Sequence, residues 1–226
     1  MSEHLSRNPA STDSGKPDTA ASFPSRAPRK RLTREERAPE ARASIFKAAA
    51  KVVGEHGYAG ASLIRIAEAA GIAQGTFYLY FDSKQTLFDE LLPHVGKDMV
   101  DFVRQRVKGI TSVIEMEERG LRAFFEYLQL NPSFFRILNE AETAAPTAYE
   151  RHFNETASHF LNALKRGIRT GEIRTFDEED LEALVYVFMA TRTYLYLRYM
   201  KGAPPGSTVP EKAIAAYMRL VRDGLK

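Results

Sequence analysis

The sequence contains no cysteine and no long hydrophobic run. The lack of cysteine excludes a disulfide framework, a thiolate metal site and a cysteine nucleophile. The longest stretch without a charged residue, Ala69–Phe81, has 13 residues, whereas a membrane-spanning helix needs about 20 predominantly apolar ones. The first residues also lack the apolar core of a secretory signal. We therefore expect a cytoplasmic protein that does not bind a membrane.

Positive charge is concentrated near the amino terminus. The whole chain of 226 residues carries a net charge of +3. Residues 26–84 contain 11 basic and 6 acidic residues, a net charge of +5, which leaves 3 − 5 = −2 for the rest. A basic segment ahead of a slightly acidic remainder indicates an anionic partner for that segment, and nucleic acid is the first candidate.

The first 34 residues have the composition of a disordered tail. Five of the 11 prolines lie within the first 39 residues, among small polar residues and few large apolar ones. Such a segment cannot bury enough apolar surface to offset the entropy lost on ordering. Within it, Arg26–Arg34 carries five positive charges. This run is either a solvated linker or an arm that contacts DNA.

Apolar residues at helical spacing predict an all-α fold. A first helix follows Pro39 and ends near Gly57, and Ser62 can cap a second helix that Gly71 terminates. A third, short helix is expected from about residue 73 to 80. Proline and glycine then mark the bounds of six more, and Pro93 should kink or split the first of these. Their predicted spans are 84–108, 112–130, 132–143, 146–170, 178–200 and 209–225.

Residues 63–81 have the pattern of a helix-turn-helix unit. Two helices that cross closely need a small residue at the crossing, which Ala67 supplies. The tight turn needs a residue that tolerates positive φ, and Gly71 follows four positions later. Phe77 and Phe81 are predicted to be buried in the core, because large apolar residues at this spacing usually are.

The other face of the third helix suits DNA. Gln74 can bond an adenine edge, Thr76 can offer a hydroxyl or a methyl group, and the hydroxyls of Tyr78 and Tyr80 can reach phosphates. No carboxylate lies between Glu68 and Asp82 to repel a phosphate backbone. Two cations flank this face. Lys84 can add a positive charge at the start of the next helix, whereas Arg65 is either a phosphate contact or a solvated charge.

Three segments resemble the TetR family of bacterial transcriptional regulators: Gly57–Ser62, Ile66–Ile72 and Gly75–Lys84. The resemblance implies a three-helix DNA-binding domain over residues 35–84 and a larger helical domain for effector binding and dimerisation over residues 85–226. It also implies that a homodimer represses transcription from a palindromic double-stranded DNA operator until a small effector releases it. By position, bases would face Gln74, Thr76 and Leu79, and phosphates would face Tyr78, Tyr80 and Lys84. Ala73 replaces a serine that often caps the third helix.

The carboxy-terminal domain is rich in aromatic residues, and Arg192 is the only charged residue between Ala183 and Leu197. A buried guanidinium needs an acidic partner or an anionic ligand. Its partner is therefore either a residue such as Glu140 or Glu142, or the effector. We expect a largely apolar effector, with or without a carboxylate. Its predicted contacts are Phe124, Tyr127, Phe135, Tyr186 and Arg192.

The last helix carries an apolar stripe that can pack inward or against a second copy of the chain. By resemblance, the last two helices of each subunit form a four-helix dimer interface. A two-fold dimer requires a palindromic operator. The stripe consists of Ile214, Tyr217, Met218, Val221 and Leu225.

Two other classes of protein fit the sequence less well than a sequence-specific regulator does. An enzyme is disfavoured because the sequence contains no GxGxxG, P-loop or GxSxG motif, and no cofactor is expected. The pair His152 and His159 could share a helix face and bind a metal, although its spacing is unusual for that role. A non-specific DNA-compacting protein would bind every sequence with a similar, steep salt dependence.

Overall fold

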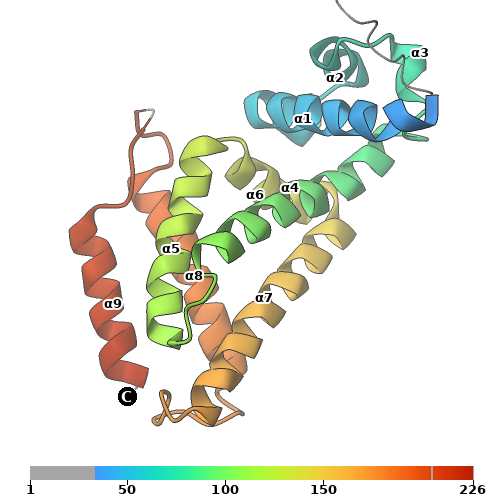
Figure 1. The fold of residues 1–226 in the computed structure, drawn as a ribbon. Helices are drawn as coiled ribbons and strands as arrows, with labels where there is room; N and C mark the ends of the chain where they lie inside the picture. Colours follow the sequence, from blue (N-terminus) through green and yellow to red (C-terminus); the bar gives the residue numbers. More distant parts are fainter. Residues whose placement is uncertain (1–33, 205, 226) are drawn as a thin grey trace, which may run out of the picture.

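The computed structural model describes residues 34–204 and 206–225, and every regular element in these ranges is helical (Figure 1). The predicted all-α fold is therefore confirmed. The predicted disordered tail lies outside the described residues, except for Arg34. The helices are α1 (Arg34–Gly60), α2 (Leu63–Ala70), α3 (Gln74–Phe77), α4 (Lys84–Arg106), α5 (Val113–Leu130), α6 (Phe134–Ala144), α7 (Pro146–Arg169), α8 (Leu181–Tyr199) and α9 (Glu211–Leu225).

Helices α1–α3 form a small unit at one end of the molecule, and α4 leads from it into the larger bundle (Figure 1). The structure differs from the predicted spans at the start of α1 and at the end of α3. Helix α1 begins at Arg34 instead of after Pro39. Helix α3 ends at Phe77 instead of residue 80. The backbone after it forms hydrogen bonds between residues three apart, as in a 3₁₀ turn: Leu79 N donates to Thr76 O (3.1 Å) and Tyr80 N donates to Phe77 O (2.9 Å).

Pro93 does not split α4, which runs from Lys84 to Arg106 with the proline inside it. Proline removes one hydrogen bond of the helix ladder and crowds the preceding turn. In α4 the neighbouring positions Leu91 and Leu92 are fully buried, and the helix packs on α1, α5, α6 and α7. We infer that this burial offsets the lost bond and keeps the helix continuous.

A first hydrophobic core joins α1, α2, α3 and the start of α4. The predicted burial of Phe77 and Phe81 is confirmed, since both side chains are almost completely enclosed. Gly71 has φ +68° at the end of α2, which is the left-handed conformation that the turn of a helix-turn-helix unit requires. Other members of this core are Ile45, Phe46, Ala49, Val52, Val53, Tyr58, Ile66, Leu87 and Leu91.

A second core fills the bundle of α4–α9, and the apolar stripe of α9 belongs to it. Ile214, Met218 and Val221 are buried, as are Tyr217 and Leu225. Of the two possibilities that the sequence left open, the stripe therefore packs inward. A dimer interface that involves α9 would have to use another face of this helix.

Helix α6 docks on the carboxy-terminal part of α1 and thereby makes a second connection between the two cores. The Glu140 carboxylate accepts a hydrogen bond from Tyr58 N at 2.8 Å. Arg136 pairs with Glu140 at 2.6 Å and donates to the carbonyl oxygens of Gly54 (3.2 Å) and Glu55 (3.1 Å). Two carbonyls near the end of α1 and the amide of the buried Tyr58 are thus satisfied by one ion pair.

Candidate DNA-binding surface and ligand cavity

The local sequence sets the geometry of the helix-turn-helix unit. The Ser62 hydroxyl accepts a hydrogen bond from Arg65 N at 3.3 Å and caps α2. Ala73 stands at the N-cap of α3 and provides no side-chain cap. Helix α3 is therefore a single turn, held mainly by the burial of Phe77 rather than by capping.

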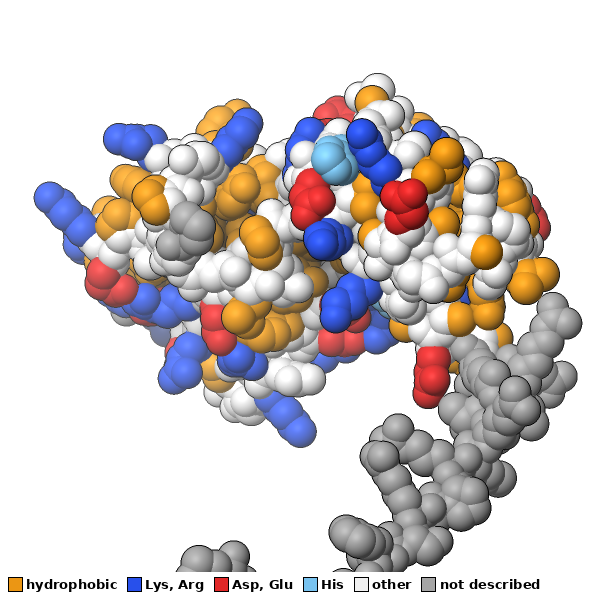
Figure 2. Space-filling view, turned by 90° about the horizontal axis from the view of Figure 1, so that it is seen from above, with side chains coloured by type: hydrophobic (Ala, Val, Ile, Leu, Met, Phe, Trp, Pro, Cys, Tyr) orange, Lys and Arg blue, Asp and Glu red, His pale blue; other side chains and the backbone are white. Residues whose placement is uncertain are grey.

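The predicted base-contacting side chains lie together at the outer end of the small unit. Gln74 is exposed, Tyr78 and Leu79 are 54% and 62% exposed, and Thr76 and Tyr80 are half-buried. Hydrophobic side chains reach the surface on the right of Figure 2, where α3 lies. Neighbouring exposed aromatic and apolar side chains beside polar ones are a feature of surfaces that bind a partner. This surface is thus a candidate site for a macromolecule.

The two flanking cations differ in their contacts. Arg65 is exposed, and its Nη1 donates to Gly60 O at 2.9 Å, at the end of α1. Lys84 is half-buried, with Nζ 5.4 Å from the ring centroid of Phe88. Both remain at the surface beside α2 and α3, where either can approach a phosphate.

Arg42 is a positioning residue that the sequence pattern does not reveal. Its Nη1 donates to Tyr80 O at 2.7 Å, and its Nη2 pairs with Glu90 at 2.5 Å. The guanidinium also lies 4.3 Å from the ring centroid of Phe81. Arg42 on α1 thus fixes the turn after α3 and the first part of α4 in one arrangement. No local pattern marks it, because its partners are 38 or more residues away.

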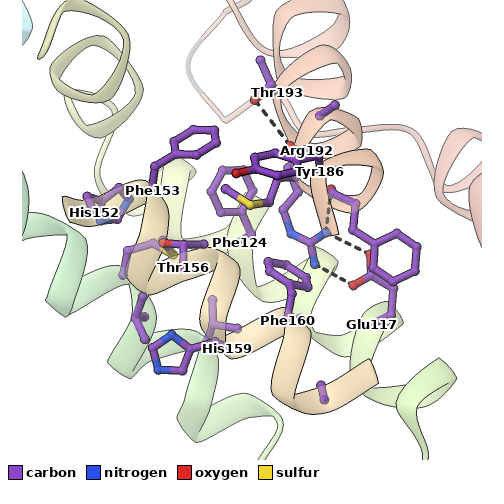
Figure 3. Close-up of a pocket in the computed structure, with 18 of the residues that line it drawn as sticks. Glu117, Phe124, His152, Phe153, Thr156, His159, Phe160, Tyr186, Arg192 and Thr193 are labelled. Carbon is purple, nitrogen blue, oxygen red and sulfur yellow. Dashed lines mark hydrogen bonds and ion pairs between the residues drawn. The ribbon is translucent and has the colours of Figure 1, made fainter. Parts of the chain in front are cut away.

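The larger bundle encloses a cavity of about 610 Å³. Helices α4, α5, α7 and α8 supply most of its wall (Figure 3). The volume is in the range of small-molecule sites in proteins, roughly 300–1,000 Å³. Much of the lining is aromatic or aliphatic, including Met99, Phe124, Phe134, Phe153, Phe160 and Phe188.

Three of the five residues predicted to contact an effector line this cavity: Phe124, Tyr186 and Arg192. The other two lie outside its wall. Tyr127 is buried and donates its hydroxyl to Val95 O at 3.2 Å, and burial raises its pKa to about 12. Phe135 is buried and stacks on Tyr196, with ring centroids 3.7 Å apart. An aromatic side chain can pack in the core or line a cavity, and sequence spacing does not distinguish these two roles.

Arg192 has a protein partner, and it is Glu117 instead of Glu140 or Glu142. Two parallel hydrogen bonds of 2.9 Å join Arg192 Nη1 and Nη2 to the two carboxylate oxygens of Glu117. Arg192 also donates to Phe188 O at 3.0 Å, and Tyr217 OH donates to Glu117 at 2.8 Å. The suggested partners were wrong because Glu140 faces α1, whereas Glu117 lies on the buried side of α5.

The environment of this ion pair keeps the Arg192 guanidinium charged. Burial alone lowers the pKa of the Arg192 guanidinium, but attraction by Glu117 outweighs burial and raises that pKa overall. Burial and the nearby Glu117 charge both raise the pKa of the Tyr217 hydroxyl, which therefore stays protonated as a donor. Helices α5, α8 and α9 are thereby tied together at the cavity wall.

His152 on α7 lines the cavity and is only 5% exposed. Burial lowers the pKa of its imidazole from 6.5 to about 4, so the ring is neutral at physiological pH. The ring packs against α4 at Gly96, where an added Cβ would lie 2.3 Å from His152 Nδ1. Glycine at this position is what allows the two helices to approach each other.

His152 does not belong to a metal cluster in the described part of the chain, where no three His, Cys, Asp or Glu side chains gather. The neighbouring His159 instead contacts Glu155 O at 2.7 Å and Arg104 Nη2 at 3.4 Å. Between residues 34 and 225, apart from residue 205, no helix is long and apolar enough to span a membrane.

A helix-turn-helix unit at one end and a cavity-bearing helical domain at the other define a DNA-binding regulator. Comparison with known proteins supports this class. Residues 45–91 match the family described as bacterial regulatory proteins, tetR family. The HTH-type transcriptional repressor KstR2 of Rhodococcus jostii (strain RHA1) is 27% identical over 191 residues, covering 81% of this chain and 90% of that protein.

Two further comparisons agree. The fatty acid metabolism regulator protein of Bacillus subtilis (strain 168) is 25% identical over 134 residues, covering 58% of this chain and 69% of that protein. The crystal structure of the regulator FadR from Bacillus subtilis, in complex with stearoyl-CoA, superposes with a TM-score of 0.65 at 19% identity, covering 81% of this chain and 99% of that one. Residues 45–91 thus carry the DNA-binding segment of the TetR family, and the relatives named here are transcriptional regulators.

Removing the Glu117 charge should destabilise the protein strongly. Glu117→Gln keeps the shape of the side chain but leaves the Arg192 cation buried without a counterion, which typically costs about 3–5 kcal/mol. The matched control is Glu118→Gln, which breaks a half-exposed pair with Arg122 and should cost about 1 kcal/mol or less. Urea unfolding followed by circular dichroism measures both. Equal losses in the two variants would contradict the structural role of the buried pair.

The buried, neutral His152 should make the protein less stable as the pH falls. The unfolded chain binds a proton near pH 6.5, whereas the folded protein resists protonation of His152 until about pH 4, so stability is lost across this window. Between pH 7 and pH 5, wild type should lose about 2 kcal/mol more unfolding free energy than His152→Gln. Urea unfolding at the two pH values gives this difference, and identical pH dependences would show that His152 is not buried as described.

Proposed function

We propose that the protein is a repressor that binds a palindromic operator as a homodimer and leaves it when a ligand occupies the cavity. Residues 35–84 would form its DNA-binding domain and residues 85–226 its ligand-binding and dimerisation domain. The observation that carries this proposal is that α4 belongs to both parts. It begins at Lys84 beside the helix-turn-helix unit and lines the cavity through Met99, Val100 and Val103.

The exposed end of the small unit supports DNA as its partner. A short helix presents Gln74 at its start, and the polar and apolar tips of Tyr78 and Leu79 stand beside it. Base edges in the major groove offer hydrogen-bonding and methyl groups that such side chains can match. In this proposal Gln74, Thr76 and Leu79 contact bases, and Arg65, Tyr78, Tyr80 and Lys84 hold phosphates.

An unpaired apolar face on α8 supports the homodimer. One side of this helix is buried, with Val185 and Phe188 in the core. The opposite side exposes large apolar residues, among them Val187 and Tyr194, the latter 70% exposed. A stable dimer buries such a face in its interface. Leu220 on the outer side of α9 is also exposed and can extend the same interface.

The shape and lining of the cavity favour an elongated, largely apolar effector. The lining positions of α7 run from Tyr149 to Arg166, a length of about 25 Å at 1.5 Å per residue. One of the solved structures similar to this chain, FadR from Bacillus subtilis, holds stearoyl-CoA, and another relative is a fatty acid metabolism regulator. We therefore propose long-chain acyl thioesters as the effector class. Phe124 and Tyr186 would contact the acyl chain beside the Arg192–Glu117 pair.

The DNA-binding proposal predicts different effects for two variants. Selection of sheared genomic DNA by the protein, followed by sequencing, should enrich one or a few palindromes. In fluorescence anisotropy on the enriched site, Tyr80→Ala should weaken binding to every sequence, because it removes a phosphate contact. Gln74→Ala should relax the preference at one base position, by about 1–3 kcal/mol per symmetric contact. Diffuse enrichment, or the same behaviour in both variants, would refute this division of roles.

The effector proposal predicts that acyl thioesters release the DNA. Stearoyl-CoA added to the protein–operator complex should lower the anisotropy of labelled DNA, whereas free coenzyme A should not, because it lacks the chain that fills the cavity. Phe160→Asp, which places a charge in the apolar wall, should abolish this response while leaving operator affinity in place. Release by coenzyme A alone, or full response of the variant, would exclude the cavity as the effector site.

A further inference from the structure

His152 is a buried polar side chain without a partner. The residue is only 5% exposed. Its ring nitrogens form no hydrogen bond with another described residue and are not among the fully enclosed unpaired atoms, so they border the cavity. A neutral imidazole carries one donor and one acceptor nitrogen. Leaving them unpaired inside a protein costs free energy unless another molecule supplies the missing bonds. Since His152 lines the cavity (Figure 3), that molecule would be a ligand.

Thr156 stands one helical turn further along α7 and repeats this feature. Residues four apart lie on the same face of a helix, and Thr156 lines the same cavity. Its Oγ1 is buried and has no hydrogen-bond partner within the described residues. A helical threonine usually bonds the carbonyl four residues earlier, as Thr193 in the same wall does with Met189 O at 3.5 Å. Thr156 is therefore unusual among the cavity threonines.

The surroundings of this pair are uncharged. Phe134 packs edge-on to the His152 ring, with centroids 6.2 Å apart, and Gly96 closes the side toward α4. Along α7, Arg151 is exposed and does not line the cavity, and the next cation is at His159, where Arg104 binds, seven residues or about 10 Å away along the helix axis. Arg166 is about 21 Å away by the same measure. An anion placed beside His152 would thus lose its hydration without meeting a counterion.

We propose that His152 and Thr156 form a polar anchor that binds one uncharged carbonyl oxygen of an otherwise apolar ligand. A carbonyl accepts two hydrogen bonds, and the imidazole N–H and the threonine O–H are two donors on adjacent turns of one helix. This inference rests on the proposed function, in which the carbonyl is that of an acyl thioester. The inference specifies where along the cavity the thioester is held and names the two residues that bind its carbonyl oxygen.

The anchor can be tested with two ligands that differ in one oxygen atom. Dodecanoyl-CoA has the thioester carbonyl, and S-dodecyl-CoA has a methylene group in its place. Isothermal titration calorimetry on the full-length protein should show about tenfold tighter binding of the thioester, the difference expected for hydrogen bonds to one buried oxygen. Equal affinities in wild type would overturn the anchor while leaving the cavity as the effector site.

Variants then locate the difference. Thr156→Val replaces the hydroxyl with a methyl group and should reduce the tenfold preference for the thioester to roughly threefold. His152→Leu should abolish that preference. His152→Gln, which keeps a donor, should retain part of it. The matched control Thr193→Val should keep the full preference. A misfolded variant would lose S-dodecyl-CoA binding as well, so this ligand reports on the integrity of each protein. Full preference in His152→Leu would overturn the proposal.

A third ligand separates this inference from the proposed function. 2-Decanone carries the carbonyl oxygen but no coenzyme A. If neither coenzyme A ligand binds while 2-decanone binds in a manner that depends on His152, the effector class is wrong and the anchor stands. If none of the three ligands binds, or if 2-decanone binds equally well to wild type and His152→Leu, the anchor is overturned.

Discussion

The larger domain depends on one buried ion pair. Glu117 and Arg192 meet through two parallel hydrogen bonds at the cavity wall, and Tyr217 completes the set. Each group would be costly to bury alone, so each fixes the position of the others. The three residues come from α5, α8 and α9, and Arg192 and Tyr217 lie 75 and 100 residues from Glu117 in the chain. The cavity therefore has a charged but internally neutralised wall whose geometry is specified by directional bonds.

This neutralisation also bears on what the cavity can bind. A guanidinium that already holds a carboxylate has little left to offer an anionic ligand. Among the described residues of the wall, the remaining unpaired polar groups are His152, the hydroxyl of Thr156 and, about 21 Å further along α7 than His152, the Nε of Arg166. An apolar molecule with a neutral oxygen satisfies these conditions better than a free acid does. The ligand preference thus follows from which polar groups the protein has satisfied internally.

Two connections join the cavity wall to the helix-turn-helix unit. Helix α4 carries cavity residues at one end and Lys84 at the other, and Arg42 binds both its first part and the turn after α3. Helix α6 makes the second connection through Arg136 and Glu140, which hold the end of α1. Because packed helices shift as rigid bodies, a ligand that displaces α4 relative to α6 must also displace the helix-turn-helix unit.

Sequence reasoning succeeded where the determining interactions are local. The cap at Ser62, the left-handed turn at Gly71 and the burial of Phe77 each involve residues a few positions apart, and all three appear in the structure. It failed for the partner of Arg192 and missed Arg42 altogether, because these depend on residues tens of positions away. The prediction that Tyr127 and Phe135 contact the effector failed for the same reason, because the spacing of aromatic residues does not indicate which side of a helix faces a cavity.

The sequence alone determined that the chain is helical and where its helix-turn-helix unit lies, because helix periodicity, caps and turns are written in neighbouring residues. The TetR resemblance came from the same local segment. Only the tertiary structure decided which polar groups are paired and which face an open cavity. That distinction depends on how α4, α5, α7 and α8 pack against one another. Packing of this kind sums many weak, long-range contacts, and no single stretch of sequence encodes it.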